Sequence, residues 1–122
     1  MIKKKLLVID DDEGFLQIMQ DFFKPKGYDV KGSSNFDDAM RIFRRDRPKV
    51  VLLDFNMPLV SGEKVLPILQ SIEPAVRVIV ITGYLQEEVE EKFKGLGYFA
   101  FFKKGDLSLE DVKDKVEEAL SY

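Results

Sequence analysis

Five short runs of apolar residues are spread along the chain, and a segment with apolar residues at helical spacing follows each of them. The runs cover residues 5–10, 28–31, 50–53, 76–81 and 99–102. Runs that are apolar at nearly every position, such as VVLL at 50–53, are typical of strands buried on both faces of a parallel sheet. Residues 28–31 alternate instead, so we expect this second strand to be more exposed.

The segments between these runs repeat apolar residues every three or four positions, which predicts amphipathic helices. The expected inner faces are Phe15, Ile18, Met19, Phe22 and Phe23; Phe36, Ala39, Met40 and Phe43; Val65, Leu66, Leu69 and Ile72; Val89, Phe93 and Leu96; and Leu109, Val112, Val116 and Leu120. Asn35 and Ser108 are candidate N-caps, and Gly27 can close the first helix. Pro67 should kink the third helix or mark a late start.

Strand and helix alternate five times without a linker or repeat. This order predicts an α/β fold, doubly wound in three layers around a parallel five-stranded sheet. We expect residues 1–122 to form a single domain, because this length suits one core. Ligands of such sheets bind beyond the carboxyl ends of the strands. The polar residues at those ends are Asp10, Asp11, Asp54, Thr82, Lys103 and Lys104.

Composition narrows the chemistry that these strand ends can perform. The chain has no cysteine and no histidine, which excludes disulfides, thiol catalysis and the commonest general base. A bound metal must therefore be held by oxygen, which favours magnesium, manganese or calcium. The net charge is −3, so the chain lacks the excess of positive charge that is typical of nucleic-acid-binding proteins. No apolar run approaches the roughly 18 residues that a membrane span needs.

The strand-end residues converge on one pocket if the strand order is 2-1-3-4-5. Carboxylates of Asp10, Asp11 and Asp54 would then repel one another unless a hard cation such as Mg²⁺ compensated their charge. A metal beside a free carboxylate, a hydroxyl and a lysine suits phosphoryl transfer to aspartate. The metal and the lysine would neutralise the negative charge of the phosphoryl group during its transfer, and Thr82 would donate a hydrogen bond to that group.

These motifs resemble those of bacterial response-regulator receiver domains, the flavodoxin-like modules of two-component signalling. The motifs are Asp10-Asp11 after LLVI, DFNMPLVSG from Asp54 (D-x-x-M-P-x-x-x-G), Thr82-Gly83, and a lysine closing the last strand. The resemblance covers essentially the whole chain, and four motifs in this order are very specific. It implies a (βα)5 fold with strand order 2-1-3-4-5.

The resemblance also implies the acceptor and the metal ligands. Asp54 is the implied phosphoacceptor. Asp10 and Asp11 would hold Mg²⁺, with Mn²⁺ as the alternative ion, one directly and one largely through water. Asp54 and the backbone carbonyl of Asn56 complete the implied protein ligands. The neighbouring acids Asp12 and Glu13 are instead expected to start the first helix, where negative charge meets the positive end of the helix dipole.

Three further positions take implied roles in switching. Thr82 is the switch hydroxyl, and Phe101 occupies the place of the switch aromatic. Lys104 pairs with the phosphoryl group and is preferred over Lys103 on the family's threonine-to-lysine spacing. Gly105 stands where the family usually has proline, so we expect trans or mixed peptide geometry and a looser loop.

The resemblance implies a sensor histidine kinase or a histidine phosphotransfer protein as phosphoryl donor, in the cytoplasm. The chain would catalyse only its own phosphorylation and dephosphorylation, and Tyr84 is a hypothetical shield of the acyl phosphate. An unknown downstream protein would receive the signal, without direct nucleic-acid binding or membrane insertion. Because the sequence ends within the last predicted helix, we expect no attached output domain. A stand-alone regulator, a phosphorelay intermediate and a piece of a longer regulator stay open.

Three other interpretations compete with this one. Asp10 and Asp12 after a strand match the first motif of haloacid-dehalogenase-type phosphatases, although we find no late acidic pair. A flavodoxin-like FMN binder would need a loop rich in Ser, Thr and Gly after the first strand, where this chain has four acids. A receiver-like fold that no longer accepts phosphate is disfavoured by the intact set of acids.

Overall fold

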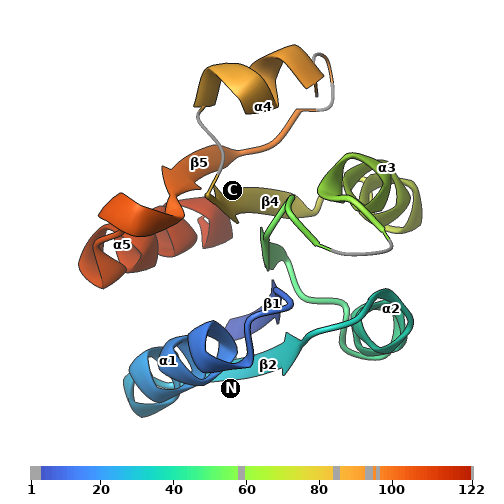
Figure 1. Ribbon diagram of the computed structural model, residues 1–122. Coiled ribbons are helices and arrows are strands. Elements are labelled where there is room, and N and C mark those ends of the chain that lie inside the picture. The colour runs from blue at the N-terminus through green and yellow to red at the C-terminus, as the bar shows by residue number, and fades with distance from the viewer. Residues whose placement is uncertain (1–3, 58–59, 84–85, 93–94, 96, 122) are drawn as a thin grey trace.

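A five-stranded parallel sheet with the order β2-β1-β3-β4-β5 forms the centre of the computed structural model (Figure 1). The strands are β1 (Lys4–Ile9), β2 (Tyr28–Ser33), β3 (Val50–Leu53), β4 (Arg77–Thr82) and β5 (Ala100–Lys103). The α-helices are α1 (Glu13–Phe23), α2 (Phe36–Asp46), α3 (Gly62–Ile72), α4 (Gln86–Lys92) and α5 (Leu109–Leu120). The structure describes residues 4–57, 60–83, 86–92, 95 and 97–121. The predicted doubly wound fold and its strand order are confirmed.

Helices cover both faces of the sheet, and each face has its own hydrophobic cluster. Helices α1 and α5 lie on one face, and α2 and α3 lie on the other (Figure 1). Side chains alternate along β1, so Leu6 and Val8 pack toward α1 and α5 while Leu7 and Ile9 pack toward α2 and α3. Every residue of β3 is buried because this strand lies between two others and under both layers. This double burial explains the unbroken apolar runs in the sequence.

Side-chain caps begin three of the helices. The carboxylate of Asp12 accepts a hydrogen bond from the amide of Phe15 at 3.2 Å, which starts α1 at Glu13. Asn35 and Ser108 cap α2 and α5 in the same way, as expected. Gly27 ends a short 3-10 extension of α1 with φ of 89°, a conformation that glycine adopts without steric cost.

One residue of the expected inner face of α1 turns out toward water. Ile18 is 52% exposed, whereas the adjacent Met19 is fully buried. Successive helical residues are rotated by about 100°, so a narrow contact with the sheet cannot bury both. Phe22, one turn beyond Ile18, is half-buried at the margin of the same contact. The periodic pattern therefore overstated the width of the buried face.

Two expected boundaries also differ by more than one residue. Helix α3 begins at Gly62, five residues before Pro67, so the suggested late start at this proline is wrong. Strand β2 continues to Ser33, two residues further than its alternating pattern indicated. Phe93 and Leu96, expected on the inner face of the fourth helix, lie outside the described residues.

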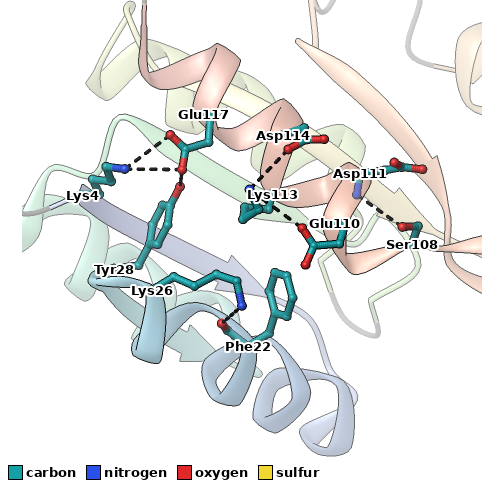
Figure 2. Close-up of polar contacts among 10 residues, drawn as sticks. All are labelled: Lys4, Phe22, Lys26, Tyr28, Ser108, Glu110, Asp111, Lys113, Asp114 and Glu117. Carbon is teal, nitrogen blue, oxygen red and sulfur yellow. Dashed lines mark hydrogen bonds and ion pairs between the residues drawn. The ribbon is translucent and has the colours of Figure 1, made fainter.

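Glu117 connects α5 to the first two strands (Figure 2). Its carboxylate accepts a hydrogen bond from the hydroxyl of Tyr28 and lies 3.4 Å from Nζ of Lys4. The ring of Tyr28 is buried and meets Phe23 edge to face, with 4.9 Å between the ring centroids. Burial, and then the hydrogen bond to Glu117, raise the pKa of Tyr28 well above its usual value. The hydroxyl therefore stays a donor at neutral pH.

We expect Tyr28→Phe to lower the free energy of unfolding at pH 7 by about 1–2 kcal/mol, because a hydrogen bond to a charged acceptor is lost. Urea denaturation measures this change. Tyr98→Phe is the matched control, since the hydroxyl of Tyr98 meets Glu90 at 3.4 Å in an exposed position. The control should change stability by less than about 0.5 kcal/mol. Equal losses in the two variants would contradict a stabilising role for Glu117.

Candidate functional site

Two buried aspartates from neighbouring strands meet at the carboxyl end of the sheet. Ile9 of β1 pairs with Leu53 of β3, so the residues that follow, Asp10 and Asp54, lie side by side. The amide of Asp54 donates to the carbonyl of Ile9 at 3.0 Å, and the amide of Asp10 donates to that of Ser33 at 3.1 Å. These two hydrogen bonds continue the pairing of the strands by one residue beyond their ends. Asp10 and Asp54 are only 1% and 5% exposed.

A third carboxylate completes an acidic cluster of Asp10, Asp11 and Asp54. One carboxylate oxygen from each lies within 4.8 Å of the other two. The amide of Asp12 donates to Oδ1 of Asp10 at 2.8 Å, and the amide of Asn56 donates to Oδ1 of Asp54 at 2.9 Å. The structure thus brings together the three acids on which the sequence analysis centred. The role of the backbone carbonyl of Asn56 as a metal ligand stays a prediction.

The acidic cluster suits a hard divalent cation. Oδ2 of Asp10 is buried and has no hydrogen-bond donor of acceptable geometry among the described residues. Nζ of Lys104 lies 2.9 Å from this oxygen but donates its hydrogen bond to Oδ1 at 3.1 Å. Buried carboxylate oxygens normally have a partner, and Mg²⁺ accepts oxygen ligands of this kind. The donor set therefore fits the implied metal.

Lys104 places its ammonium among the acids. Besides Asp10, Nζ lies 3.7 Å from Oδ2 of Asp54 and 3.9 Å from Oδ2 of Asp12. It also sits 4.6 Å from the centre of the Phe15 ring. Burial would lower the pKa of Lys104, but the hydrogen bond to Asp10 and the attraction of the surrounding carboxylates outweigh it and raise the pKa. Lys104 therefore stays charged beside the cluster.

Strands β4 and β5 carry the other predicted residues. Thr82 is fully buried at the end of β4 and pairs with the exposed Lys103, so Lys104 lies one residue beyond it. Side chains alternate along a strand, which puts Thr82 on the same face as Val80. Phe101 pairs with Val80 and packs, half-buried, against the cluster on that face. The predicted switch pair thus shares one face of the sheet.

The chain after Lys104 forms a short 3-10 turn over Lys104–Asp106. Among the described residues every peptide bond is trans, including those around Gly105. This agrees with the trans alternative that the absence of proline suggested. Tyr84, the hypothetical shield, lies outside the described residues.

The glycine of the D-x-x-M-P-x-x-x-G motif is required by a close backbone contact. The amide of Gly62 donates to the carbonyl of Phe55 at 3.2 Å. A Cβ atom at Gly62 would lie 2.7 Å from Cα of Phe55 and would clash with its ring. Phe55 is buried and cannot move aside easily. The loop after Asp54 can therefore close onto α3 only when residue 62 has no side chain.

Gly62→Ala should destabilise the protein by about 1–3 kcal/mol, because the added methyl group overpacks a buried backbone contact. Urea denaturation provides the measurement. Gly105→Ala is the matched control: a Cβ there meets no atom within 4 Å. We expect the control to stay within about 0.5 kcal/mol of the wild type. A Gly62→Ala protein as stable as the control would contradict this explanation of the motif.

Burial sets the ionisation of Asp10. It raises the pKa of this carboxyl from 3.8 to about 6, although the hydrogen bonds from Lys104 and from the amide of Asp12 act in the opposite direction. The folded protein therefore binds this proton more tightly than the unfolded chain. Ionisation of Asp10 costs stability as the pH rises through the window between about 4 and 6, on the order of 3 kcal/mol in total.

Asp10→Asn is expected to raise the free energy of unfolding at pH 7.5 in metal-free buffer by about 1–3 kcal/mol, because the buried charge is removed. The difference from the wild type should shrink toward zero below about pH 3, where Asp10 is protonated in both the folded and the unfolded state. Urea denaturation across this pH range, with a chelator present, tests it. Asp11→Asn removes an exposed charge and serves as control. A gain independent of pH would contradict the assignment.

Two residues near the site do more than the structural roles predicted for them in a receiver domain. Asp12 caps α1, as expected, but its carboxylate also approaches Lys104. Phe15 is part of the core, as expected, but its ring also lies beside the ammonium group. The position of Asp12 directly after the acidic pair was a usable signal. No local pattern could have indicated that Phe15 meets a residue almost ninety positions later.

Comparison with known proteins identifies the family. Residues 6–117 match the family model of the response regulator receiver domain, and the chain belongs to this family. It is 29% identical over 120 residues to sporulation initiation phosphotransferase F of Bacillus subtilis, a match that covers 98% of this chain and 96% of the relative. It is 34% identical over 96 residues to the probable transcriptional regulator ycf27 of Porphyridium aerugineum, covering 79% of this chain but 39% of that protein.

Solved structures agree with this assignment. A response regulator receiver domain from Clostridium thermocellum is 28% identical, with a TM-score of 0.86 over 96% of this chain and 94% of that one. A response regulator from Burkholderia pseudomallei, solved with a phosphorylated aspartic acid, a calcium ion and citrate, shares the fold. Its identity is 24% and its TM-score 0.74, over 98% of this chain and 75% of that one.

The chain is thus a receiver domain of a two-component response regulator, a class of phosphoacceptor signalling domains. Such domains interact with histidine kinases or phosphotransfer proteins. Within the described ranges, none of the helices has both the length and the apolar character needed to cross a membrane.

Proposed function

We propose that Asp54 accepts a phosphoryl group from a sensor histidine kinase or a histidine phosphotransfer protein, and that the modified chain regulates a downstream protein. The observation that best supports this is the meeting of three carboxylates within 4.8 Å, with the ammonium of Lys104 beside them. In this proposal residues 1–122 act as one receiver domain in the cytoplasm, without direct contact to nucleic acid or insertion into a membrane.

Asp54 is the nucleophile of the proposed reaction. Its Oδ1 accepts a hydrogen bond from the amide of Asn56, which orients the carboxylate and leaves Oδ2 for attack. Oδ2 forms a bond to phosphorus as the bond from phosphorus to the donor's histidine nitrogen breaks, and that nitrogen keeps the electron pair. Lys104, 3.7 Å from Oδ2, faces the oxygens of the incoming group. Its positive charge offsets the negative charge that gathers there.

Asp10, Asp11 and Asp54, with the backbone carbonyl of Asn56, are the residues that would hold Mg²⁺, or Mn²⁺ in its place. When bound, the ion relieves the repulsion among the carboxylates and neutralises charge on the transferring group. The buried Oδ2 of Asp10, which has an ion pair with Lys104 but no hydrogen bond among the described residues, supports this assignment. Lys104 now donates to Asp10, and a phosphoryl group on Asp54 would offer it a second set of acceptors.

Thr82 and Phe101 are the proposed switch. The hydroxyl of Thr82 would donate a hydrogen bond to the phosphoryl group and draw the end of β4 toward Asp54. Phe101 is half-buried on the same face, so a shift of Thr82 changes the space into which its ring can pack. Phosphorylation would thereby bias a two-state equilibrium on the β4–β5 face, where a downstream protein can read it.

Autophosphorylation from a small donor tests the proposal. The protein is incubated with acetyl phosphate and Mg²⁺, and its intact mass is measured. The wild type should gain the mass of one phosphoryl group, because the chain itself supplies the nucleophile and the charged groups around it. Asp54→Ala should gain none, and Asp10→Ala should lose most of the labelling. Asp114→Ala, which removes an exposed carboxylate on α5, should be labelled like the wild type.

Two outcomes would count against this function. Labelling that persists in Asp54→Ala but disappears in Asp10→Ala would make Asp10 the nucleophile, as in phosphatases of the haloacid dehalogenase type. A yellow purified protein with a flavin spectrum would favour the FMN-binding alternative.

A further inference from the structure

A cavity of about 260 Å³ lies at the end of the sheet opposite the acidic cluster. We call it the basic cavity, and its lining comes from three separate segments. The connection between α2 and β3 contributes Arg47, Pro48 and Lys49. The segment from the end of α3 into β4 contributes Glu73, Ala75 and Arg77, and α5 contributes Ala119.

Positive charge dominates the rim of the basic cavity. Three cationic side chains face one carboxylate, and Oε1 of that carboxylate, on Glu73, accepts a hydrogen bond from the amide of Ala75 at 3.2 Å. Neither Arg47 nor Lys49 forms an ion pair with any carboxylate in the described part of the chain. This contrasts with Arg41 and Arg45 on the neighbouring helix, which are both paired with aspartates.

Contacts within the chain join the segments of the cavity wall and restrain the two arginine side chains. The amide of Arg77 donates to the carbonyl of Lys49 at 2.8 Å, which joins the two connections at the cavity wall. Nη1 of Arg47 donates to the carbonyl of Ile72 at 3.3 Å. The guanidinium carbon of Arg77 lies 5.9 Å from the centre of the Phe99 ring. The arginines are therefore positioned before any ligand arrives, which lowers the entropic cost of binding.

We propose that the basic cavity binds a small phosphorylated organic anion, no larger than a mononucleotide. Excess positive charge at a concave surface selects an anion, and guanidinium groups match phosphate with paired hydrogen bonds. Pro48, Ala75 and Ala119 give the cavity apolar surface that suits the organic part of a ligand. The volume lies just below the range of roughly 300–1,000 Å³ found for drug-sized ligands, which favours a small ligand.

The basic cavity is separate from the acidic cluster, although the same two strands run between them. Lys49 precedes β3 and Asp54 follows it, while Arg77 begins β4 and Thr82 ends it. Five residues of strand span about 16 Å, so one small ligand cannot contact both sites. The proposal therefore does not depend on phosphorylation of Asp54.

The test is a titration of the full chain with AMP at low ionic strength, followed by amide chemical shifts. Saturable shifts should appear around Arg47, Lys49 and Arg77. Adenosine, which lacks the phosphate, should cause none, and inorganic phosphate should bind at least about tenfold more weakly than AMP because it leaves the apolar surface uncovered. Asp54→Ala should bind AMP like the wild type, so failure here and failure of the phosphorylation proposal are distinguishable.

Variants locate the binding. R47N/K49Q/R77Q should weaken AMP binding at least about tenfold, since charge-assisted hydrogen bonds are lost. Asn at position 47 tolerates the left-handed backbone, where φ is 49°. K24Q/R44Q/K64Q removes three exposed cations elsewhere and should bind AMP within about twofold of the wild type. Lys49→Glu changes a single exposed residue and should also weaken AMP binding at least about tenfold. This variant tests the proposal even if the triple variant does not fold.

Several results would overturn the proposal. These are the absence of saturable shifts with AMP, shifts centred on Asp10 and Asp54, and equal binding of AMP by R47N/K49Q/R77Q and its control. Adenosine or inorganic phosphate binding as tightly as AMP would overturn the assigned ligand class.

Discussion

Crowding of negative charge at the carboxyl ends of β1 and β3 is the constraint on which the rest of this structure depends. Strand pairing places Asp10 beside Asp54 and buries both. Burial removes hydration from Asp10, and the charge of Asp54 adds a smaller repulsion, so the pKa of Asp10 is raised to about 6. Lys104 relieves part of this repulsion from the end of β5. The site is thus assembled in an unrelaxed state that an added cation can relax.

The fold tolerates this cost because packing elsewhere is extensive. Both faces of the sheet carry a continuous hydrophobic cluster, and every residue of β3 is buried. Backbone amides donate hydrogen bonds to the carboxylates of Asp10, Asp12 and Asp54, and these bonds tie the strand and helix termini around the site. A rigid frame of this kind keeps the acids together when they would otherwise separate.

Local signals in the sequence were enough for the alternating α/β architecture, whereas the strand order that brings the site residues together came from the resemblance to receiver domains. Buried strands appear as apolar runs, and side-chain caps such as Asn35 and Ser108 are local, so both were predictable. Contacts between distant segments were not. The exposure of Ile18 depends on how wide a strip of α1 the sheet can cover. The approach of Phe15 to Lys104 and the basic cavity likewise depend on tertiary placement, which periodicity does not encode.

The double use of Asp12 has a consequence for how this chain can diverge. Its carboxylate caps the first turn of α1, and the same group approaches Lys104. Asn, Ser or Thr could replace it as a cap, but none of them carries the charge. Glutamate would keep the charge but is not among the favoured caps. Asp12 must therefore meet two requirements at once, a cap for α1 and a negative charge near Lys104. Few substitutions at this position satisfy both.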